Sequence, residues 1–560
     1  MKTFLCAVLL SANLNSYGTV TTYQWGSIYN QRGFVIKQPA GTTGFVAVGT
    51  VFDATISPSA GTLHGIQFLH LDASGNILST KVHYINVGNP GNHDESYRVV
   101  DLTEDPDNGG FYITLQVNDK TPGAEQDFIW LYHVDINGNR TATYDRHIGN
   151  DANHTNVSHK NYYATATTYY NHQFFVCGYA ADGTQFPNEP DATHSDKWGM
   201  LARIYAGGIR MTFWDTPPAN NLDFDMPLAM HVDPNTHTLL VTGAANAISY
   251  TSPITNYYST TSGILSLSFN PNDFSIPWLP VSQNVLFYPF TSIIVINPDG
   301  TSTTIPEGYF GKDIVANAVG EVFILANRFY DKTPKGWGVA NVDLPTMQGP
   351  TGNNFSALGD VADNWATQFY TDQRGQFTTQ PITVVGQQAH FYCEKSTSWL
   401  NPSYTNVDPF IGNYTVTGYG LGAAGTFSGV TNSHNIEMSN LGTLAFSPGA
   451  DYYTGRTNSA LENVTRLYNF STVDVNTSDI AMIAPVANIF PGPSGHLSMK
   501  FIRTNGVGKE SQCNAYTDDC ILQASSIGLS NFNQFSFDYR ESTLIENPDV
   551  TVSTPAFSLL

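Results

Sequence analysis

The chain has 560 residues, of which 41% are hydrophobic, 13% aromatic and only 12% charged. Such a chain can bury a large core, and most of its polar surface must come from Asn, Thr, Ser, Gln, Gly and Tyr. Its formal net charge of −22 would repel a polyanion, which argues against nucleic-acid binding. The composition suits contact with sugars or protein surfaces, and it is equally compatible with a solvated extracellular shell.

The chain begins with a segment typical of a secretory signal. Met1 and Lys2 precede the apolar run TFLCAVLL at residues 3–10, and small residues follow at Ser16 and Gly18. This pattern predicts a signal peptide over residues 1–18 and a mature chain, residues 19–560, that is secreted or held at the cell surface. The apolar run is too short to span a bilayer, and no later segment approaches a transmembrane helix.

Removal of the signal peptide would leave four cysteines, which permit three disulfide pairings. Cys513 and Cys520 lie close together in the polar segment CNAYTDDC, which favours a local disulfide between them. Cys177 lies in an apolar strand pattern, where a cysteine usually acts as a small buried hydrophobic residue. No spacing of Cys and His suggests a zinc site.

Two sets of short apolar segments recur along the chain at intervals of about 65 residues, with one longer interval before the last member. The first set is FVAVG, FYITL, FFVCG, LLVTG and VFILA, beginning at Phe45, Phe111, Phe174, Leu239 and Val322. The second set is FLHLD, LYHVD, LARIY, LSLSF and VANVD, beginning at Phe68, Leu131, Leu201, Leu265 and Val339. Their β-branched and aromatic residues predict that each segment is a strand.

Turns and further strands complete each interval. A segment such as SYRVVDL precedes members of the first set, and turns rich in Asp, Asn and Gly, such as EDPDNGG, separate the two. The turns DASGN at Asp72 and DINGN at Asp135 follow the second set, and a fourth strand can come next, as at residues 77–83. We therefore predict an all-β fold, a β-propeller of about seven four-stranded antiparallel blades with long loops. Separate sandwich domains would need roughly 100 residues each.

The pattern is clear over about residues 40–350 and weaker over residues 351–560, which we expect to hold divergent blades and a closing segment of one propeller. ITVVG from Ile382 and TLAFS from Thr443 fit a sixth and a seventh unit, and six or eight blades remain open. Because an unpaired sheet edge promotes aggregation, a strand from one end of the chain should pair with the blade at the other end. Residues 23–36 are the candidate for this strand.

The combination of a GGF-type strand start with a strand that ends in VDxNGN resembles the propeller repeats of secreted bacterial surface proteins, including cargo of the type IX secretion route. The resemblance covers about residues 20–350. It implies a propeller fold and an exterior location, and it carries over no active-site residues. Such cargo usually ends in a C-terminal sorting domain, and the last residues here, PDVTVSTPAFSLL, show no clear one.

One turn concentrates oxygen ligands of the kind that Ca²⁺ prefers. Glu104, Asp105, Asp107 and Asn108 lie together in EDPDNGG, but the bidentate glutamate of an EF-hand is missing, since Gln116 stands at the corresponding later position. A structural Ca²⁺ site is therefore one interpretation. The other is a hairpin turn of Asp, Asn and Gly that needs no metal.

A second candidate group is His93, Asp94 and Glu95, where a histidine and two acids could act as base and orienting groups. His154 and His159 also fall in a loop. The chain lacks a GxSxG motif, an HExxH helix and the SxDxGxxW box of sialidase propellers. Loop histidines are more often simply solvated.

Aromatic pairs in the loops could bind sugars or anchor a protein interface. The doublets Tyr257-Tyr258 and Tyr452-Tyr453 are the best candidates, whereas most other aromatic residues would pack between blades.

Three hypotheses follow for the function. The first is a secreted, non-enzymatic propeller that acts as a surface adhesion or extracellular assembly subunit, binds other proteins or glycans and forms homo- or hetero-oligomers. The second is a carbohydrate-active enzyme, a glycoside hydrolase or lyase, with His93, Asp94 and Glu95 as the first residues to test. The third is a Ca²⁺-stabilised module that binds only neighbours of its own kind. Fold alone does not choose between them.

Overall fold

The structure of the chain is a computed structural model. It describes residues 22–26, 29–53, 64–85, 96–119, 126–149, 161–181, 197–205, 208–216, 223–233, 235–248, 263–287, 292–296, 302–316, 322–330, 333–349, 355–358, 364–369, 386–396, 407–417, 426–436, 471–473, 480–487, 497–504, 516–519, 524–527, 530–542, 550–553 and 558–559. In these residues the chain is all-β, and the one helix is the short 3₁₀ turn Ala142–Tyr144. No helix in the described part is long and apolar enough to cross a membrane.

The described strands form antiparallel units of four, in which consecutive strands pair with one another. Units one to three comprise β2 (Tyr29–Lys37), β3 (Phe45–Asp53), β4 (His64–Leu71) and β5 (Ile77–Ile85); β6 (Ser96–Glu104), β7 (Phe111–Asp119), β8 (Gln126–Val134) and β9 (Arg146–Ile148); and β10 (Asn161–Tyr170), β11 (Gln173–Ala181), β12 (Lys197–Tyr205) and β13 (Gly208–Asp215).

The next three units follow the same order along the chain. They comprise β14 (Asp223–Val232), β15 (Leu239–Ile248), β16 (Gly263–Phe269) and β17 (Ser282–Phe287); β19 (Ser302–Ala316), β20 (Val322–Tyr330), β21 (Thr333–Val342) and β22 (Phe355–Leu358), with β18 (Ser292–Ile296) beside β19; and β23 (Asn364–Phe369), β24 (Gly386–Ser396), β25 (Val407–Thr417) and β26 (Thr426–Ile436). One parallel pair, Lys197 with Phe224, links the third and fourth units into a ten-stranded sheet.

The seventh unit combines strands from both ends of the chain. It contains β27 (Ser471–Val473), β28 (Ile480–Ala487), β29 (Leu497–Thr504) and β1 (Thr22–Gly26), in that order. Tyr23 of β1 lies opposite Phe501 of β29, so part of the segment expected to pair the two chain ends does so. The rest of that segment forms β2, the first strand of the first unit.

The recurring segments of the sequence fall at equivalent places in these units. Each member of the first set lies in a second strand, namely β3, β7, β11, β15 or β20, and each member of the second set lies in a third strand, namely β4, β8, β12, β16 or β21. The expectation of an all-β chain built from antiparallel sheets is confirmed. TLAFS from Thr443 and the expected signal peptide, residues 1–18, lie outside the described residues.

The turns DASGN and DINGN are held by their own first residue, as expected for hairpin chemistry. Oδ1 of Asp72 accepts hydrogen bonds from the backbone N–H groups of Ser74 and Asn76, each at 2.8 Å. Asp135 does the same for Asn137 at 2.9 Å and Asn139 at 2.8 Å. These aspartates therefore close turns between third and fourth strands.

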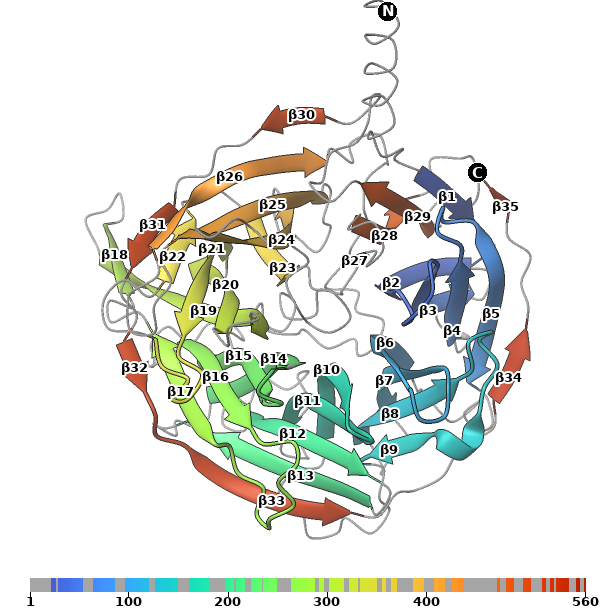
Figure 1. Cartoon of the computed structure of the whole chain (residues 1–560), viewed down its shortest axis with the longest axis horizontal. Helices are drawn as coiled ribbons and strands as arrows, with labels where there is room; N and C mark the ends of the chain where they lie inside the picture. Colours follow the sequence, from blue (N-terminus) through green and yellow to red (C-terminus); the bar gives the residue numbers. More distant parts are fainter. Residues whose placement is uncertain are drawn as a thin grey trace, which may run out of the picture.

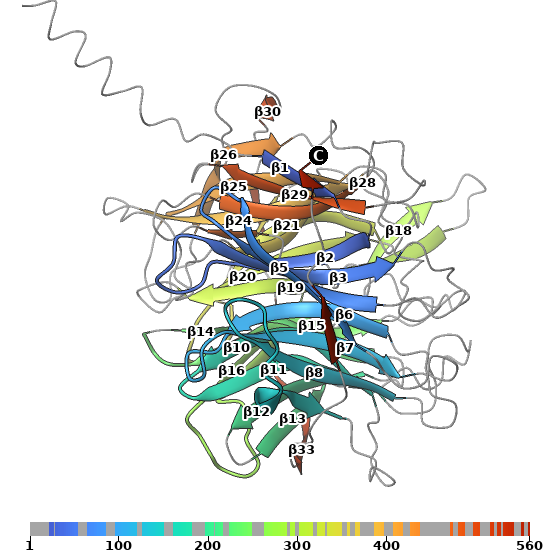
Figure 2. The ribbon, with the colours of Figure 1, turned by 90° about the vertical axis from the view of Figure 1, so that its right-hand side faces the viewer.

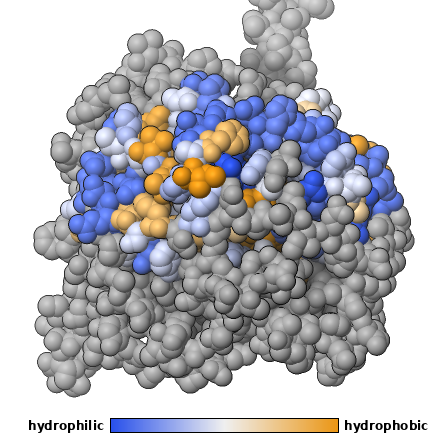
Figure 3. All heavy atoms as spheres, turned by 90° about the horizontal axis from the view of Figure 1, so that it is seen from below, coloured by the Kyte–Doolittle hydropathy of each residue, from blue (hydrophilic) through white to orange (hydrophobic). Residues whose placement is uncertain are grey.

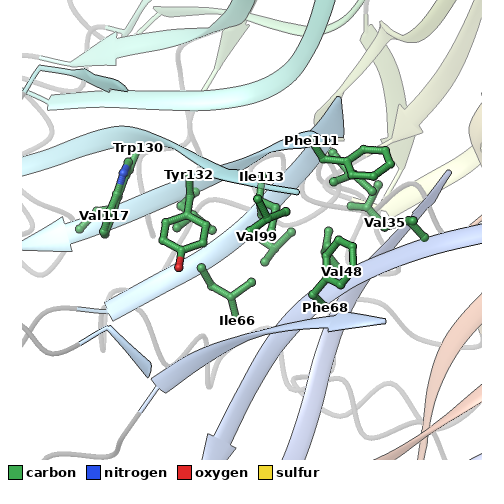
Figure 4. Close-up of a cluster of buried hydrophobic side chains, with 14 of the residues drawn as sticks. Val35, Val48, Ile66, Phe68, Val99, Phe111, Ile113, Val117, Trp130 and Tyr132 are labelled. Atoms are coloured by element: carbon green, nitrogen blue, oxygen red, sulfur yellow. The ribbon is translucent and has the colours of Figure 1, made fainter. Parts of the chain in front are cut away.

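The core lies between neighbouring units as well as within them. Figure 4 shows Phe68, Val48 and Ile66 of the first unit facing Phe111, Ile113 and Tyr132 of the second. All six side chains are fully or almost fully buried. Because one apolar face of a four-stranded sheet has to be covered, each unit depends on its neighbour for stability.

The units are arranged around a common centre, with the first strands near it (Figure 1). Figure 2 shows the same units from the side, with β5 across the front. The C-terminal strands lie on the outside, where each adds a further strand to one unit: β30 (Tyr516–Asp519) on β26, β31 (Ala524–Ile527) on β22, β32 (Ser530–Phe532) on β17, β33 (Ser536–Ser542) on β13, β34 (Val550–Ser553) on β5 and β35 (Ser558–Leu559) on β1. The end of the chain thus runs around the molecule in the direction opposite to the units.

Candidate functional site

The acidic turn, residues 104–110 between β6 and β7, is stabilised by hydrogen bonds to the carboxylate of Asp105. Asp105 is 2% exposed. Its Oδ1 accepts hydrogen bonds from the backbone N–H groups of Asp107 at 3.1 Å and Asn108 at 3.3 Å, and its Oδ2 accepts one from the Asn108 side chain at 2.9 Å. Glu104, at the end of β6, accepts a bond at 3.0 Å from the backbone N–H of Ala40 in the first unit. Both acids therefore serve the hairpin and its packing.

A buried histidine lies beneath this turn. Nε2 of His133, in β8, is 3.2 Å from Oδ2 of Asp105, and both side chains are almost fully buried. The imidazole packs edge-on against Tyr112 and Tyr144, with ring centroids 4.8 and 5.0 Å away. Burial works to raise the pKa of Asp105, but the contacts with His133 and Asn108 outweigh it, so the pKa lies below its usual value. Asp105 is therefore ionised at neutral pH.

Asp107 faces the next unit and pairs with an exposed histidine. Its Oδ1 is 2.6 Å from Nδ1 of His172, which is 79% exposed. Asn171 and His172 form the turn between β10 and β11 with φ angles of 48° and 60°, in the left-handed region that two-residue hairpin turns require. The turn thus directs the imidazole to Asp107, and the exposed ring remains accessible for hydrogen bonds with a partner.

The carboxylates of the calcium candidate are thus directed to different donors: Glu104 to Ala40, Asp105 to its own turn and His133, and Asp107 to His172. Calcium would have to replace these contacts with six or more convergent oxygens. Within the residues that the structure describes, no three side chains of His, Cys, Asp or Glu form a group that could hold a metal ion. The Ca²⁺ site stays a prediction from sequence, and the geometry gives it no further support.

The same histidine turn touches a loop between β16 and β17. Nδ2 of Asn171 donates a hydrogen bond at 3.0 Å to Oδ1 of Asn272. Asn272 belongs to residues 270–281, here called the apolar loop. The acidic turn, the Asn171–His172 turn and the apolar loop therefore form one continuous surface across three units, and this surface is the candidate site.

The apolar loop exposes large hydrophobic side chains. Phe274 is 53% exposed, Ile276 60%, Leu279 42% and Val281 68%. Figure 3 shows hydrophobic residues gathered among hydrophilic ones on the lower face of the molecule, where β13, β17 and β33 lie in Figure 1. Single exposed hydrophobic residues are common on proteins, but four of them on one short loop are typical of a contact surface.

A buried arginine fixes the conformation of this loop. Arg203, in β12, is fully buried. Its guanidinium group donates hydrogen bonds to the carbonyl oxygens of Pro271 at 3.2 Å and Asp273 at 2.5 Å. The guanidinium carbon also lies 4.1 Å from the ring centroid of Trp278 and 4.7 Å from that of Phe274. The side chain of Arg203 thus contacts the apolar loop at its start, at its tip and at Trp278 near its end.

Side chains of β13 hold the loop as well. Arg210 donates to the carbonyl oxygen of Phe274 at 2.9 Å, and the Thr212 hydroxyl donates to that of Trp278 at 2.6 Å. Trp278 is fully buried, and its Nε1–H donates to the carbonyl oxygen of Asn270 at 3.0 Å. Since these bonds fix the backbone, the exposed side chains are presented in one arrangement, which lowers the entropy cost of binding.

Most of the other residues singled out in the sequence lie outside the residues that the structure describes. These are His93, Asp94 and Glu95, the tyrosine pairs 257–258 and 452–453, and Cys513 with Cys520. Cys177 lies in β11 and is buried as a free thiol, as expected. No family model matches this chain, and no curated protein is significantly similar to it.

Sequence reasoning missed the apolar loop and its arginine. The segment NPNDFSIPWLPV contains three prolines and reads as a turn. Arg203 stands in LARIY, where a single arginine among apolar residues is the sole hint of a buried cation. Such a residue is rare in a buried strand unless it is paired, so it could have been flagged.

Proposed function

We propose that the chain is a β-propeller of seven blades, each blade being one of the four-stranded units. Three observations support this: the strands of each unit pair in chain order, the units lie around a common centre (Figure 1), and β1 from the N-terminal region completes the last unit beside β29. In a ring closed in this way, every unit has a neighbouring unit on both sides.

We further propose that this propeller is a secreted or cell-surface binding subunit without catalytic activity, and that it docks to another protein through the apolar loop. The observation that carries the proposal is the set of four exposed hydrophobic side chains on a loop whose backbone Arg203 fixes. Aromatic and aliphatic anchors on a rigid support, with polar groups such as His172 beside them, are typical of interface centres. The low content of charged residues agrees with such a surface.

Site-specific photo-crosslinking in the source cells tests this proposal. A photoreactive residue replaces Val281 of the loop or, as the matched control, Leu78 of β5, which is 60% exposed on another unit. We expect a discrete crosslinked protein species from position 281, several-fold more abundant than any from position 78. The additional substitution Ile276→Ser should abolish it by removing a neighbouring apolar contact. Equal yields from the two positions would rule out the loop as the docking surface.

A further inference from the structure

The C-terminal segment at residues 530–542, here called the belt segment, adds an outer strand to two neighbouring units. β32 pairs with β17 over three positions, from Val285 opposite Phe532 to Phe287 opposite Ser530. β33 pairs with β13 along its whole length, from Ile209 opposite Ser542 to Asp215 opposite Ser536. Both units already have four strands without it, so the belt segment occupies edges that the rest of the chain has formed.

One side chain of the belt segment has a specific polar site. Oδ1 of Asn531 accepts hydrogen bonds from Nδ2 of Asn284 at 2.8 Å and from the backbone N–H of Gly349 at 3.2 Å. Asn284 is fully buried. Nδ2 of Asn284 also donates to the carbonyl oxygen of Met347 at 3.3 Å, so Asn531 supplies the second acceptor for a buried amide group. This contact favours asparagine at one position of the bound strand.

Aromatic residues of the belt segment supply apolar contacts. Phe535, Phe537 and Tyr539 pack against the buried cluster that contains Trp214 and Leu201. The rings of Phe535 and Phe537 stack with centroids 5.9 Å apart. Phe537 and Tyr539 are two residues apart in β33 and so lie on one face of the strand, and this alternation is how an added strand is recognised by side chain.

The edge beneath the belt segment would attract other strands. β13 is largely apolar, and Ile209, Met211 and Phe213 are buried in it. A long apolar edge strand presents backbone groups that pair readily with another chain. The belt segment covers this edge with β33, whose sequence contains Asp538, Arg540 and Glu541.

We propose that the outer edges of β13 and β17 form a strand-binding site for the sequence of residues 530–542, and that this site takes the segment from a second copy of the chain as well as from its own. A second copy is the partner because it carries the same asparagine and aromatic residues at the spacing that the site recognises. Exchange of the belt segment between copies would join them without any new interface.

Cysteine trapping with the full-length chain tests the exchange. Arg210 and Glu541 lie opposite each other in the register of β13 and β33. One chain carries Arg210→Cys and a second, differently tagged chain carries Glu541→Cys. After the two are mixed and oxidised, we expect a disulfide-linked heterodimer that exceeds either homodimer several-fold. A chain with both substitutions is the positive control, since it should form the bond within one molecule.

The proposal would be overturned if the disulfide formed within the double-cysteine chain but no heterodimer formed in the mixture. The belt segment would then never leave its own molecule.

A second measurement uses a fluorescent peptide with the sequence of residues 530–542. It should bind a full-length chain with Asn531→Ala and Phe537→Ala at least tenfold more tightly than the unaltered chain, whose own segment competes. A peptide with the same two substitutions is the control. Equal binding of both peptides would mean that the edge has no sequence preference and would also overturn the proposal.

Discussion

At the scale of single residues, Arg203 illustrates how one side chain determines the shape of a surface. It is fully buried, stacks on two aromatic rings and donates hydrogen bonds to two loop carbonyl groups and, at 3.4 Å, to Gln173. Burial is the main cause that lowers its pKa to about 10, so the guanidinium group is still charged at neutral pH. Lysine could not replace it, since one ammonium group cannot serve all of these partners in a plane.

We therefore expect Arg203→Met to lower the free energy of unfolding by about 2–4 kcal/mol, because buried carbonyl groups lose their donors. Urea denaturation followed by tryptophan fluorescence would measure this. Arg210→Met is the control and should cost about 1 kcal/mol, since Arg210 is partly exposed and its bond to Phe274 lies at the surface. Equal losses for both variants would show that Arg203 has no special role in the loop.

Two adjacent glycines in the acidic turn give a sharper comparison. Gly109 and Gly110 have φ angles of 74° and 102°. A Cβ atom on Gly109 would meet open space, whereas one on Gly110 would clash with the carbonyl oxygen of Val134. We expect Gly109→Ala to cost about 1 kcal/mol of stability from backbone strain alone, and Gly110→Ala about 3 kcal/mol or more. Thermal unfolding of the two variants checks the order, and a larger loss for Gly109→Ala would contradict the turn geometry.

At the scale of elements, the first strand of a unit is irregular in a consistent way. The pairings of β2, β6, β10, β14, β19 and β23 with their second strands all contain a register shift. Bulges of this kind bend a strand and turn a side chain toward a neighbour. In β6 the shift lies next to Asp101, whose Oδ2 accepts hydrogen bonds from the backbone N–H and the hydroxyl of Thr167 in the next unit. The bulge thus links neighbouring units.

We expect Asp101→Ala to destabilise the protein by about 2–3 kcal/mol, because the buried backbone N–H groups of Thr167 and Leu102 lose the carboxylate that accepts their hydrogen bonds. Thr167→Ser is the matched control. It keeps both donors and should cost about 1 kcal/mol for the lost methyl group. Chemical denaturation measures both. Equal stability of Asp101→Ala and the unaltered chain would mean that this contact between units contributes nothing net.

At the scale of the whole molecule, buried histidines connect stability to pH. Burial is the main cause that lowers the pKa of His83 and of His147 to about 4, from an ordinary value near 6.5. Neutral His83 is well satisfied, since its Nδ1 lies 2.6 Å from the Tyr132 hydroxyl and its Nε2 lies 2.8 Å from the carbonyl oxygen of Gly138. Folding therefore requires these rings to be uncharged.

Between pH 6.5 and pH 4 the unfolded chain binds protons that the folded chain does not, so stability should fall as the pH is lowered through this range. We expect each histidine to contribute a loss of about 3 kcal/mol at pH 4. Urea midpoints at pH 7, 5.5 and 4.5 would measure the trend. His83→Gln should show a smaller dependence on pH than the unaltered chain, and an unchanged dependence would contradict the assignment to His83.

Much of the local structure could be read from the sequence. The alternating segments at Phe111 and Phe174 are strands, and Asp72 and Asp135 close the turns in which they were expected, because strand propensity and turn chemistry act over a few residues. The sequence did not decide whether the acidic turn is a calcium site, since the same Asp and Asn residues suit a metal loop and a hairpin. Only the distances to Ala40, His133 and His172 show where the carboxylates point.

The sequence by itself therefore determined the all-β class, the antiparallel units and the positions of their second and third strands. The tertiary structure decided which distant segments meet: residues 530–542 with β13 and β17, Asp107 with His172, and Arg203 with the apolar loop. The physical reason is that strand pairing and burial of a cation depend on partners far away in the chain, and no local pattern specifies them.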